Sequence, residues 1–145
     1  MEIFTADNVT FMLQGLVNTI VIAAASIVLS ILVGTVLALV KTYCTGKLRP
    51  LAWLVSAYIE LFRCTPNLLW ILIFRFTLKG SGVAISIAVF TTFTSAVMAE
   101  IVRGGLNAIP RGQFEAARSQ GFGFFGMMWH IVLPQAFRHI VPALF

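Results

Sequence analysis

The sequence predicts an all-α integral membrane protein built as a multi-span helical bundle. Of its 145 residues, 59% are hydrophobic and only 10% are charged, which is too little charge for a soluble domain. The stretches 10–40 and 80–99 carry no charge and provide the roughly 20 residues that a helix needs to cross a bilayer. The net charge of +5 lies mostly in short breaks between apolar runs, which is typical of membrane topology and not of nucleic-acid binding.

The first span is expected at about 10–40. It is not a secretory signal, because residues 1–10 carry two acidic side chains and no basic one, and the uncharged run is longer than a signal core. Small residues recur at every fourth position, which would let another helix approach one face closely; chance in a chain rich in Ala, Ser and Gly is the alternative. These residues are Ser26, Ser30, Gly34 and Ala38.

The second span is expected at about 51–74, although it contains Glu60 and Arg63. Their i, i+3 spacing would let them pair on one helix face. Alternatively, because ionisable residues at membrane depth are often functional, they would form part of a gate or substrate path. The Thr65-Pro66 step predicts a helix break or a new helix start.

The third span is expected at about 80–102. Glu100 and Arg103 have the same i, i+3 spacing, and they either pair within the helix or form a gate element. Thr92 and Ser95 either line a polar path or bond back to their own helix, as Ser and Thr often do. A second series of small residues, four apart, predicts another packing face: Gly80, Ala84, Ala88, Thr92 and Ala96.

The last apolar stretch, about 131–145, is expected to begin a fourth span that is cut off at Phe145, so the chain would be a fragment or a truncated protein. Cations cluster in the breaks after the first and third spans, which two crossings separate. The positive-inside tendency places both breaks in the cytoplasm and the N-terminus outside. The clusters are Lys41, Lys47 and Arg49, and Arg103, Arg111 and Arg118.

Residues 112–121 predict a short polar helix between the third and fourth spans. Pro110 blocks a helix arriving from the third span and can start a new one. We expect Glu115 near the helix start and Arg118 near its end, where each charge opposes the helix dipole, and Gly121 at the left-handed position beyond the end. Because a helix this short is marginal in water, it has to be held, and the aromatic and Met residues at 122–129 would seat it at the membrane interface. It is either a plain connector or a docking element.

The residues at 115–134 carry a recognisable pattern. Glu115-Ala116-Ala117, Gly121, Ile131 and Leu133-Pro134 match, at full spacing, the EAA motif of ABC importer permeases. Further segments, YIELFRCTP at 58–66, AEIVRGG at 99–105 and IPRGQ at 109–113, resemble the polar amino-acid subfamily, with Cys64 where Gly is usual. The chain therefore resembles, over nearly its whole length, the transmembrane permease subunit of an ABC-type polar amino-acid importer.

The resemblance implies a single permease domain over 1–145 of the type I importer fold, incomplete because the subfamily has five spans. The short helix would be the coupling helix, which docks into a groove on a cytoplasmic ATPase. The ATPase-contact candidates are Glu115, Ala116, Ala117 and Gly121, and the residues that would set the re-entry into the membrane are Ile131, Leu133 and Pro134. The implied partners are a dimer of ABC ATPases carrying ATP and Mg, a second permease chain, identical or not, and an extracytoplasmic amino-acid-binding protein. The implied location is the bacterial cytoplasmic membrane.

No enzyme signature is present in the sequence. Because it lacks a GxxxxGK[ST] phosphate loop, any ATP would be hydrolysed in a partner chain. Two histidines nine positions apart and two cysteines without CxxC spacing predict no catalytic, cofactor or metal site. A second hypothesis is a truncated, non-transporting membrane subunit with an assembly or regulatory role. An ion channel is a weaker third, because no selectivity-filter pattern occurs. The sequence leaves the transported amino acid open.

Overall fold

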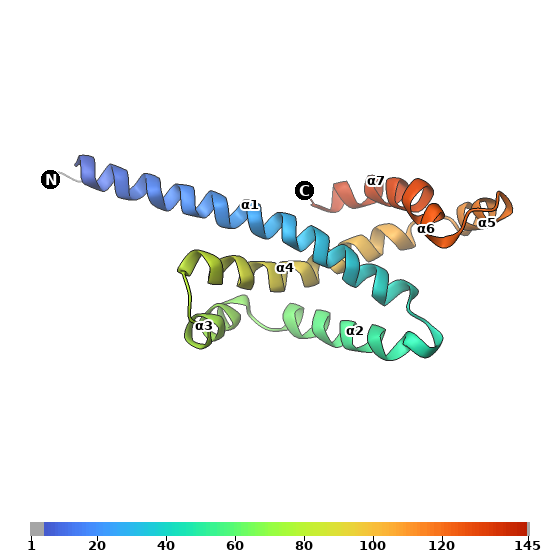
Figure 1. The fold of residues 1–145 in the computed structure, drawn as a ribbon, viewed down its shortest axis with the longest axis horizontal. Helices are drawn as coiled ribbons and strands as arrows, with labels where there is room; N and C mark the ends of the chain where they lie inside the picture. Colours follow the sequence, from blue (N-terminus) through green and yellow to red (C-terminus); the bar gives the residue numbers. More distant parts are fainter. Residues whose placement is uncertain (1–4, 145) are drawn as a thin grey trace.

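The computed structural model describes residues 5–144, which form helices joined by short turns and contain no strand in that range. This all-α architecture is the predicted fold class (Figure 1). The elements, in chain order, are α1 (Ala6–Tyr43), the 3-10 turn η1 (Gly46–Leu48), α2 (Arg49–Cys64), α3 (Asn67–Thr77), α4 (Gly82–Asn107), α5 (Arg111–Ser119), α6 (Phe124–Met127), the π-helical turn η2 (Met128–Val132) and α7 (Leu133–Leu144).

Two helices of the described chain, α1 with 38 residues and α4 with 26, are long and apolar enough to cross a membrane. A third crossing is possible only as a broken span, because the η1–α2 segment and α3 meet at 104°. The break lies at Pro66, where the sequence predicted one. Thr65 is extended (φ −98°, ψ 136°), since the proline ring disfavours helical geometry in the residue before it. The 51–74 segment is therefore not one straight span.

Helix α4 is the centre of the bundle and packs against α1, α2, α3 and α7 (Figure 1). The buried residues of α1 are the four small residues that the sequence placed on one face: Ser26, Ser30, Gly34 and Ala38. A Cβ on Gly34 would lie 2.7 Å from the Met98 Cβ and 3.0 Å from the Ser95 carbonyl oxygen. This face is therefore a true interface, and the explanation by chance is wrong.

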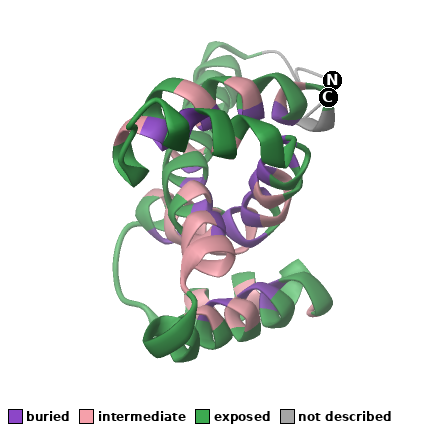
Figure 2. Ribbon diagram, turned by 90° about the vertical axis from the view of Figure 1, so that its right-hand side faces the viewer, coloured by how far each residue is buried: buried purple, intermediate pink, exposed green. Residues whose placement is uncertain are grey.

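The second predicted series of small residues packs only in its later part, because Ala96 is fully buried against α2 while Ala88 and Thr92 are half-buried. Gly80 precedes the helix and Ala84 is exposed, whereas larger side chains such as Ile85, Val89 and Met98 are buried. On the side that faces α1, Met98 fills the room that Gly34 leaves, so these two faces are complementary. Figure 2 shows the buried residues on the helix faces that turn toward the interior.

Two clusters of buried side chains stabilise the bundle, one on each side of α4. The first joins α1, α4, α5 and the C-terminal helices, and its buried members are Ala38, Met98, Val102, Leu106, Ile109, Ala117, Met127, Met128, Val132, Ala136 and Ile140. The second joins α2 to α4, and its buried members are Val55, Ile59, Phe62, Ala96 and Ala99. Helix α5 is therefore connected to the membrane helices through a continuous apolar core.

The C-terminal helical segment begins earlier than expected. Elements α6, η2 and α7 follow one another without a gap from Phe124, so the helix starts before the predicted fourth span at about 131. Within η2 the Leu133 N–H donates to the Met128 carbonyl, five residues back. Pro134 follows directly, and its ring would clash with the carbonyl four residues before it in a regular α-helix. The wider π turn accommodates the proline without ending the helix.

Candidate functional site: helix α5 and its connection to the bundle

Helix α5 spans Arg111–Ser119, close to the predicted 112–121. Pro110 is its N-cap residue, with an extended ψ of 139°, and its carbonyl accepts a 3.0 Å bond from the Gln113 N–H. Arg118 lies in the last turn, as predicted, where its charge favours the helix dipole. Glu115 lies in the middle of the helix and the first turn holds no acidic residue, so its expected place near the start is wrong.

The end of α5 is a Schellman motif. Gly121 has φ +81°, the left-handed conformation that the sequence predicted for it. The Phe122 N–H donates to the Ala117 carbonyl at 3.1 Å, and the Gly121 N–H donates to the Arg118 carbonyl at 3.0 Å. These two bonds satisfy carbonyls that a helix end otherwise leaves unpaired. The helix is therefore a rigid unit with a defined exit.

The two faces of α5 differ in burial. Ala117 is only 2% exposed and belongs to the apolar core, and half-buried Phe114 packs against the same cluster. Glu115, Ala116 and Arg118 are exposed on the other side of the helix. Expecting Ala117 to contact a partner protein directly was therefore wrong, because its methyl group packs inside this chain. Its contribution is to hold α5 on the bundle.

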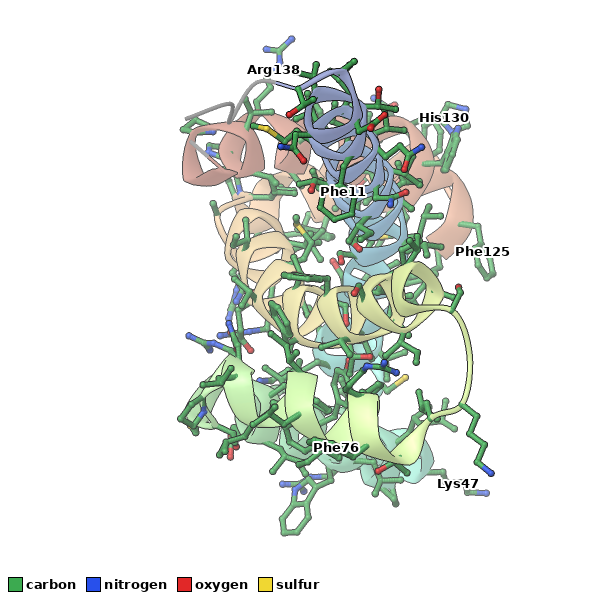
Figure 3. All side chains as sticks on the ribbon, turned by 90° about the vertical axis from the view of Figure 1, so that its left-hand side faces the viewer. Phe11, Lys47, Phe76, Phe125, His130 and Arg138 are labelled. Atoms are coloured by element: carbon green, nitrogen blue, oxygen red, sulfur yellow. The ribbon has the colours of Figure 1, made fainter. Side chains whose placement is uncertain are left out.

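The methionines and the aromatic residues after α5 have different environments. Met127 and Met128 are 3% and 5% exposed and pack in the cluster that contains Ala117. Phe125 and Trp129 are 85% and 72% exposed, and Phe125 projects from the outer side of the molecule (Figure 3). The methionines thus form the protein seat for α5, and the exposed aromatic rings are the part suited to a membrane interface.

The other three motif residues lie where the C-terminal helix begins. Ile131, in η2, and Leu133, the first residue of α7, are half-buried and pack against the core cluster, whereas Pro134 is exposed beside the π turn. A bond of 3.1 Å from Gln135 Nε2 to Gln113 Oε1 ties α7 to α5 directly. A displacement of α5 would therefore be transmitted to α7 through both apolar and polar contacts.

Glu100 is the centre of a three-residue charge cluster. Its Oε2 accepts bonds from Arg103 Nε at 3.0 Å and Nη2 at 2.7 Å, so the predicted intrahelical pair is present. Its Oε1 lies 2.7 Å from Lys41 Nζ on α1. The sequence did not predict that Lys41 belongs to this cluster, because no local sequence pattern places α1 beside Glu100.

The second candidate pair behaves differently. Glu60 and Arg63 are both exposed, and they do not belong to the ion pairs of the described chain, which involve Lys41, Glu100 and Arg103. The predicted pairing on one face of α2 is therefore not formed, although the spacing equals that of Glu100 and Arg103. Helix α2 turns Val55, Ile59 and Phe62 inward, which leaves both charged residues outside the helix contact.

Thr92 and Ser95 bond within their own helix, which was the second of the two alternatives. The Thr92 hydroxyl donates to the Ala88 carbonyl at 2.7 Å, and Ser95 Oγ lies 2.9 Å from the Thr92 carbonyl oxygen. The Tyr58 hydroxyl from α2 joins them, 2.6 Å from that carbonyl and 2.9 Å from Ser95 Oγ. Ser95 is fully buried, so this group is a polar joint between α2 and α4. No spacing in the sequence predicts that Tyr58 of α2 bonds to α4.

The described residues contain no group of three or more His, Cys, Asp or Glu side chains that could hold a metal ion. His130 and His139 are exposed, and His130 Nδ1 lies 3.0 Å from the Gly126 carbonyl oxygen in its own helical segment. Cys44 and Cys64 are free cysteines. The chemically distinctive features are therefore the surface of α5 and the polar contacts that join the helices.

Comparison with known proteins identifies the family. The family described as "Binding-protein-dependent transport system inner membrane component" matches residues 30–145. The chain is 34% identical over 143 residues to the probable glutamine ABC transporter permease protein GlnM of Bacillus subtilis (strain 168), covering 95% of this chain and 65% of the relative. It is 35% identical over 146 residues to the arginine transport system permease protein ArtQ of the same strain, covering 97% of this chain and 65% of the relative.

A solved structure shows the same fold. The chain superposes with a TM-score of 0.70 and 28% identity on a protein described as "Crystal structure of an amino acid ABC transporter with histidines", covering 97% of this chain and 70% of that chain. The chain spans somewhat less than two thirds of the length of the two curated relatives. The family match covers most of the chain, and the helical bundle agrees with it. The chain belongs to the family of binding-protein-dependent transport system inner membrane components.

Proposed function

We propose that this chain is the membrane-spanning permease subunit of an ATP-driven ABC importer for polar amino acids. Helix α5 would be the coupling helix, docking into a groove on a cytoplasmic ATPase that binds ATP and Mg. A second permease chain and an extracytoplasmic amino-acid-binding protein would complete the assembly. The membrane would be the bacterial inner membrane, with the N-terminus outside.

The observation that carries this proposal is the division of α5 into a buried face and an exposed face. Glu115, Ala116 and Arg118 face away from the bundle, while Ala117 attaches the helix to the core. A connector between spans needs no rigid end, whereas a helix that transmits motion has to move as one body. The Schellman end and the Gln135–Gln113 bond give α5 that rigidity and a route into α7.

The amino-acid class rests on the relatives. Their names specify glutamine and arginine, and the solved neighbour is described as an amino acid ABC transporter. Side chains of different charge occur among these substrates, so the names support a class and not one compound. The orientation rests on charge, because the cations at 41–49 and 103–118 favour the cytoplasm.

The test is a pull-down of the tagged chain from detergent-solubilised native membranes, with co-purifying proteins identified by mass spectrometry. We expect a P-loop ATPase and an amino-acid-binding protein with the wild-type chain, and loss of the ATPase with Glu115→Lys. The matched control is Glu60→Lys, the same charge reversal at an exposed glutamate on α2, which should retain the ATPase.

Two results would contradict the assignment. One is the absence of any ATPase from the wild-type pull-down, and the other is an ATPase that survives Glu115→Lys as well as Glu60→Lys does. In the full-length protein, Glu115→Lys should also abolish amino-acid uptake. The ligand released from the co-purified binding protein, identified by mass spectrometry, would name the substrate.

A further inference from the structure

A bipartite groove lies at the turn between α1 and α2, outside the surface of α5. Its larger part is a hollow of about 720 Å³, lined by Gly46, Arg49, Pro50, Trp53, Leu54 and Ala57. Apart from Arg49, this lining is apolar. Trp53 and Leu54 are 76% and 68% exposed, so two large apolar side chains face outward at the end of a membrane span.

The smaller part is a polar hollow of about 350 Å³ that adjoins the first. Lys41, Thr45 and Ser56, whose side chains end in an ammonium group and two hydroxyl groups, are among the residues that line it. Gly46, Arg49 and Trp53 line both parts, so the polar and the apolar hollows are continuous. The groove therefore presents hydrogen-bond donors at one end and an apolar surface at the other.

The polar end carries an excess of positive charge. No acidic side chain lines either hollow. Glu100 neutralises only one of the two cations bonded to it, since Lys41 and Arg103 share that single carboxylate. Arg49 takes no part in these ion pairs, which are those of the described chain, and Lys47 lies two residues before it. An anion in the polar hollow would therefore meet uncompensated charge.

The position of the groove matches that of a lipid headgroup. The α1–α2 turn lies at the end of the molecule that also carries α5, beyond the last turn of the long span α1 (Figure 1). Tryptophan and basic residues are enriched at this level of a bilayer, where cations attract anionic headgroups. A phosphate needs the donors of the polar hollow, and an acyl chain needs the apolar wall beside it.

We propose that this groove binds an anionic phospholipid. The phosphate occupies the hollow between Lys41 and Arg49, and an acyl chain lies along Pro50, Trp53 and Leu54. A second copy of the chain would cover the apolar part and leave Arg49 without an anionic partner, and a zwitterionic lipid would gain less from the charge. This assignment does not rest on the transport activity proposed above.

The experiment uses the whole 145-residue chain in phosphatidylcholine vesicles, with Trp53 as the reporter in a Trp70→Phe/Trp129→Phe background. Brominated phosphatidylglycerol or brominated phosphatidylcholine is added, and quenching of Trp53 fluorescence gives their relative binding constants. We expect a preference of about fivefold for phosphatidylglycerol, the contribution of one cation near the membrane surface. Arg49→Gln should bring the ratio close to one, and Arg49→Lys should keep most of it.

Two controls separate this site from general attraction to a basic protein. Lys79→Gln removes a cation in the loop between α3 and α4, and it should leave the ratio at Trp53 unchanged. A chain that retains only Trp129, which is also exposed, should show a weaker preference. Circular dichroism establishes that each variant keeps its helices.

Equal quenching by both lipids, or an unchanged ratio in Arg49→Gln, would overturn the proposal. Failure of both lipids to quench Trp53 would overturn it too, because the groove would then be covered by protein. A preference that is as strong at Trp129 as at Trp53 would show bulk electrostatic attraction in place of a site.

Discussion

Lys41 Nζ lies 2.7 Å from Glu100 Oε1 and thereby joins α1 to α4 across 59 positions of the chain. The other oxygen of the same carboxylate is bonded to Arg103. Both oxygens of Glu100 are thus satisfied, and its side chain is only 17% exposed. Charge-assisted bonds of this kind are stronger than neutral ones and fix orientation as well as distance. The cluster therefore holds the two long helices, α1 and α4, together.

Glu100→Gln should loosen this contact. The amide keeps the size of the side chain but loses the charge that attracts two cations, so we expect a loss of about 1–2 kcal/mol in the free energy of unfolding. The measurement is unfolding of the chain in mixed micelles, followed by circular dichroism. Glu60→Gln, at an exposed glutamate outside these ion pairs, serves as the control and should cause little change. Equal losses for the two variants would contradict the interpretation.

Tyr58→Phe should weaken the polar joint between α2 and α4. The change keeps the ring contacts to Phe62 and removes the hydroxyl that lies 2.6 Å from the Thr92 carbonyl oxygen. A loss of about 1 kcal/mol is expected for one hydrogen bond. In the control, Tyr43→Phe, the edge-to-face ring contact with Phe124 is retained. The same unfolding measurement should show a larger loss for Tyr58→Phe than for the control.

Two adjacent glycines in α4 should respond to alanine in opposite ways. A Cβ on Gly105 would lie 2.5 Å from Ile140 Cγ1 and 3.1 Å from the Ala136 carbonyl oxygen, so Gly105→Ala should push α7 away and cost about 1–3 kcal/mol. A Cβ on Gly104 meets nothing within 4 Å, so Gly104→Ala should be neutral or stabilising by up to about 1 kcal/mol.

A double-mutant cycle with Ile140→Ala tests the cause of the Gly105 effect. If the clash is with Ile140, the double variant should be less destabilised than the sum of the single variants. Strict additivity would place the damage elsewhere in the helix.

The sequence predicts correctly those features that depend on the residues of one helix alone. The four-residue repeat from Ser26 to Ala38 identified the buried face of α1, because small side chains on one face favour close helix packing. Pro66 and Gly121 were also placed correctly, since each acts on its own backbone through a missing N–H or a left-handed φ.

The sequence does not predict the contacts that depend on how two helices lie relative to each other. Glu60–Arg63 and Glu100–Arg103 share one spacing, yet only the second pair forms, with Lys41 from α1 as a third member. The small residues of α4 resembled those of α1, but only the later part of that series, which ends at the buried Ala96, packs against a neighbouring helix. Ala117 was expected to contact a partner protein because the residues around it in α5 are those of a surface helix. It is buried instead, because Met127 and Met128 of the next segment pack in the same cluster.

The last prediction concerns the end of α5, where Gly121→Ala should destabilise the helix without any steric clash. A Cβ on Gly121 meets nothing within 4 Å, so the cost arises from φ +81°, which an L-residue adopts at about 1–2 kcal/mol. Gly112→Ala, inside the same helix and also in open space, should instead stabilise it by up to about 1 kcal/mol. Hydrogen exchange should therefore become faster in Gly121→Ala and slower in Gly112→Ala for the α5 amides, with the amides in the centre of α4 unchanged in both. Faster exchange throughout the chain in Gly121→Ala would mean that α5 is required for the stability of the whole bundle, and equal exchange in the two variants would show that the left-handed end does not determine the stability of this helix.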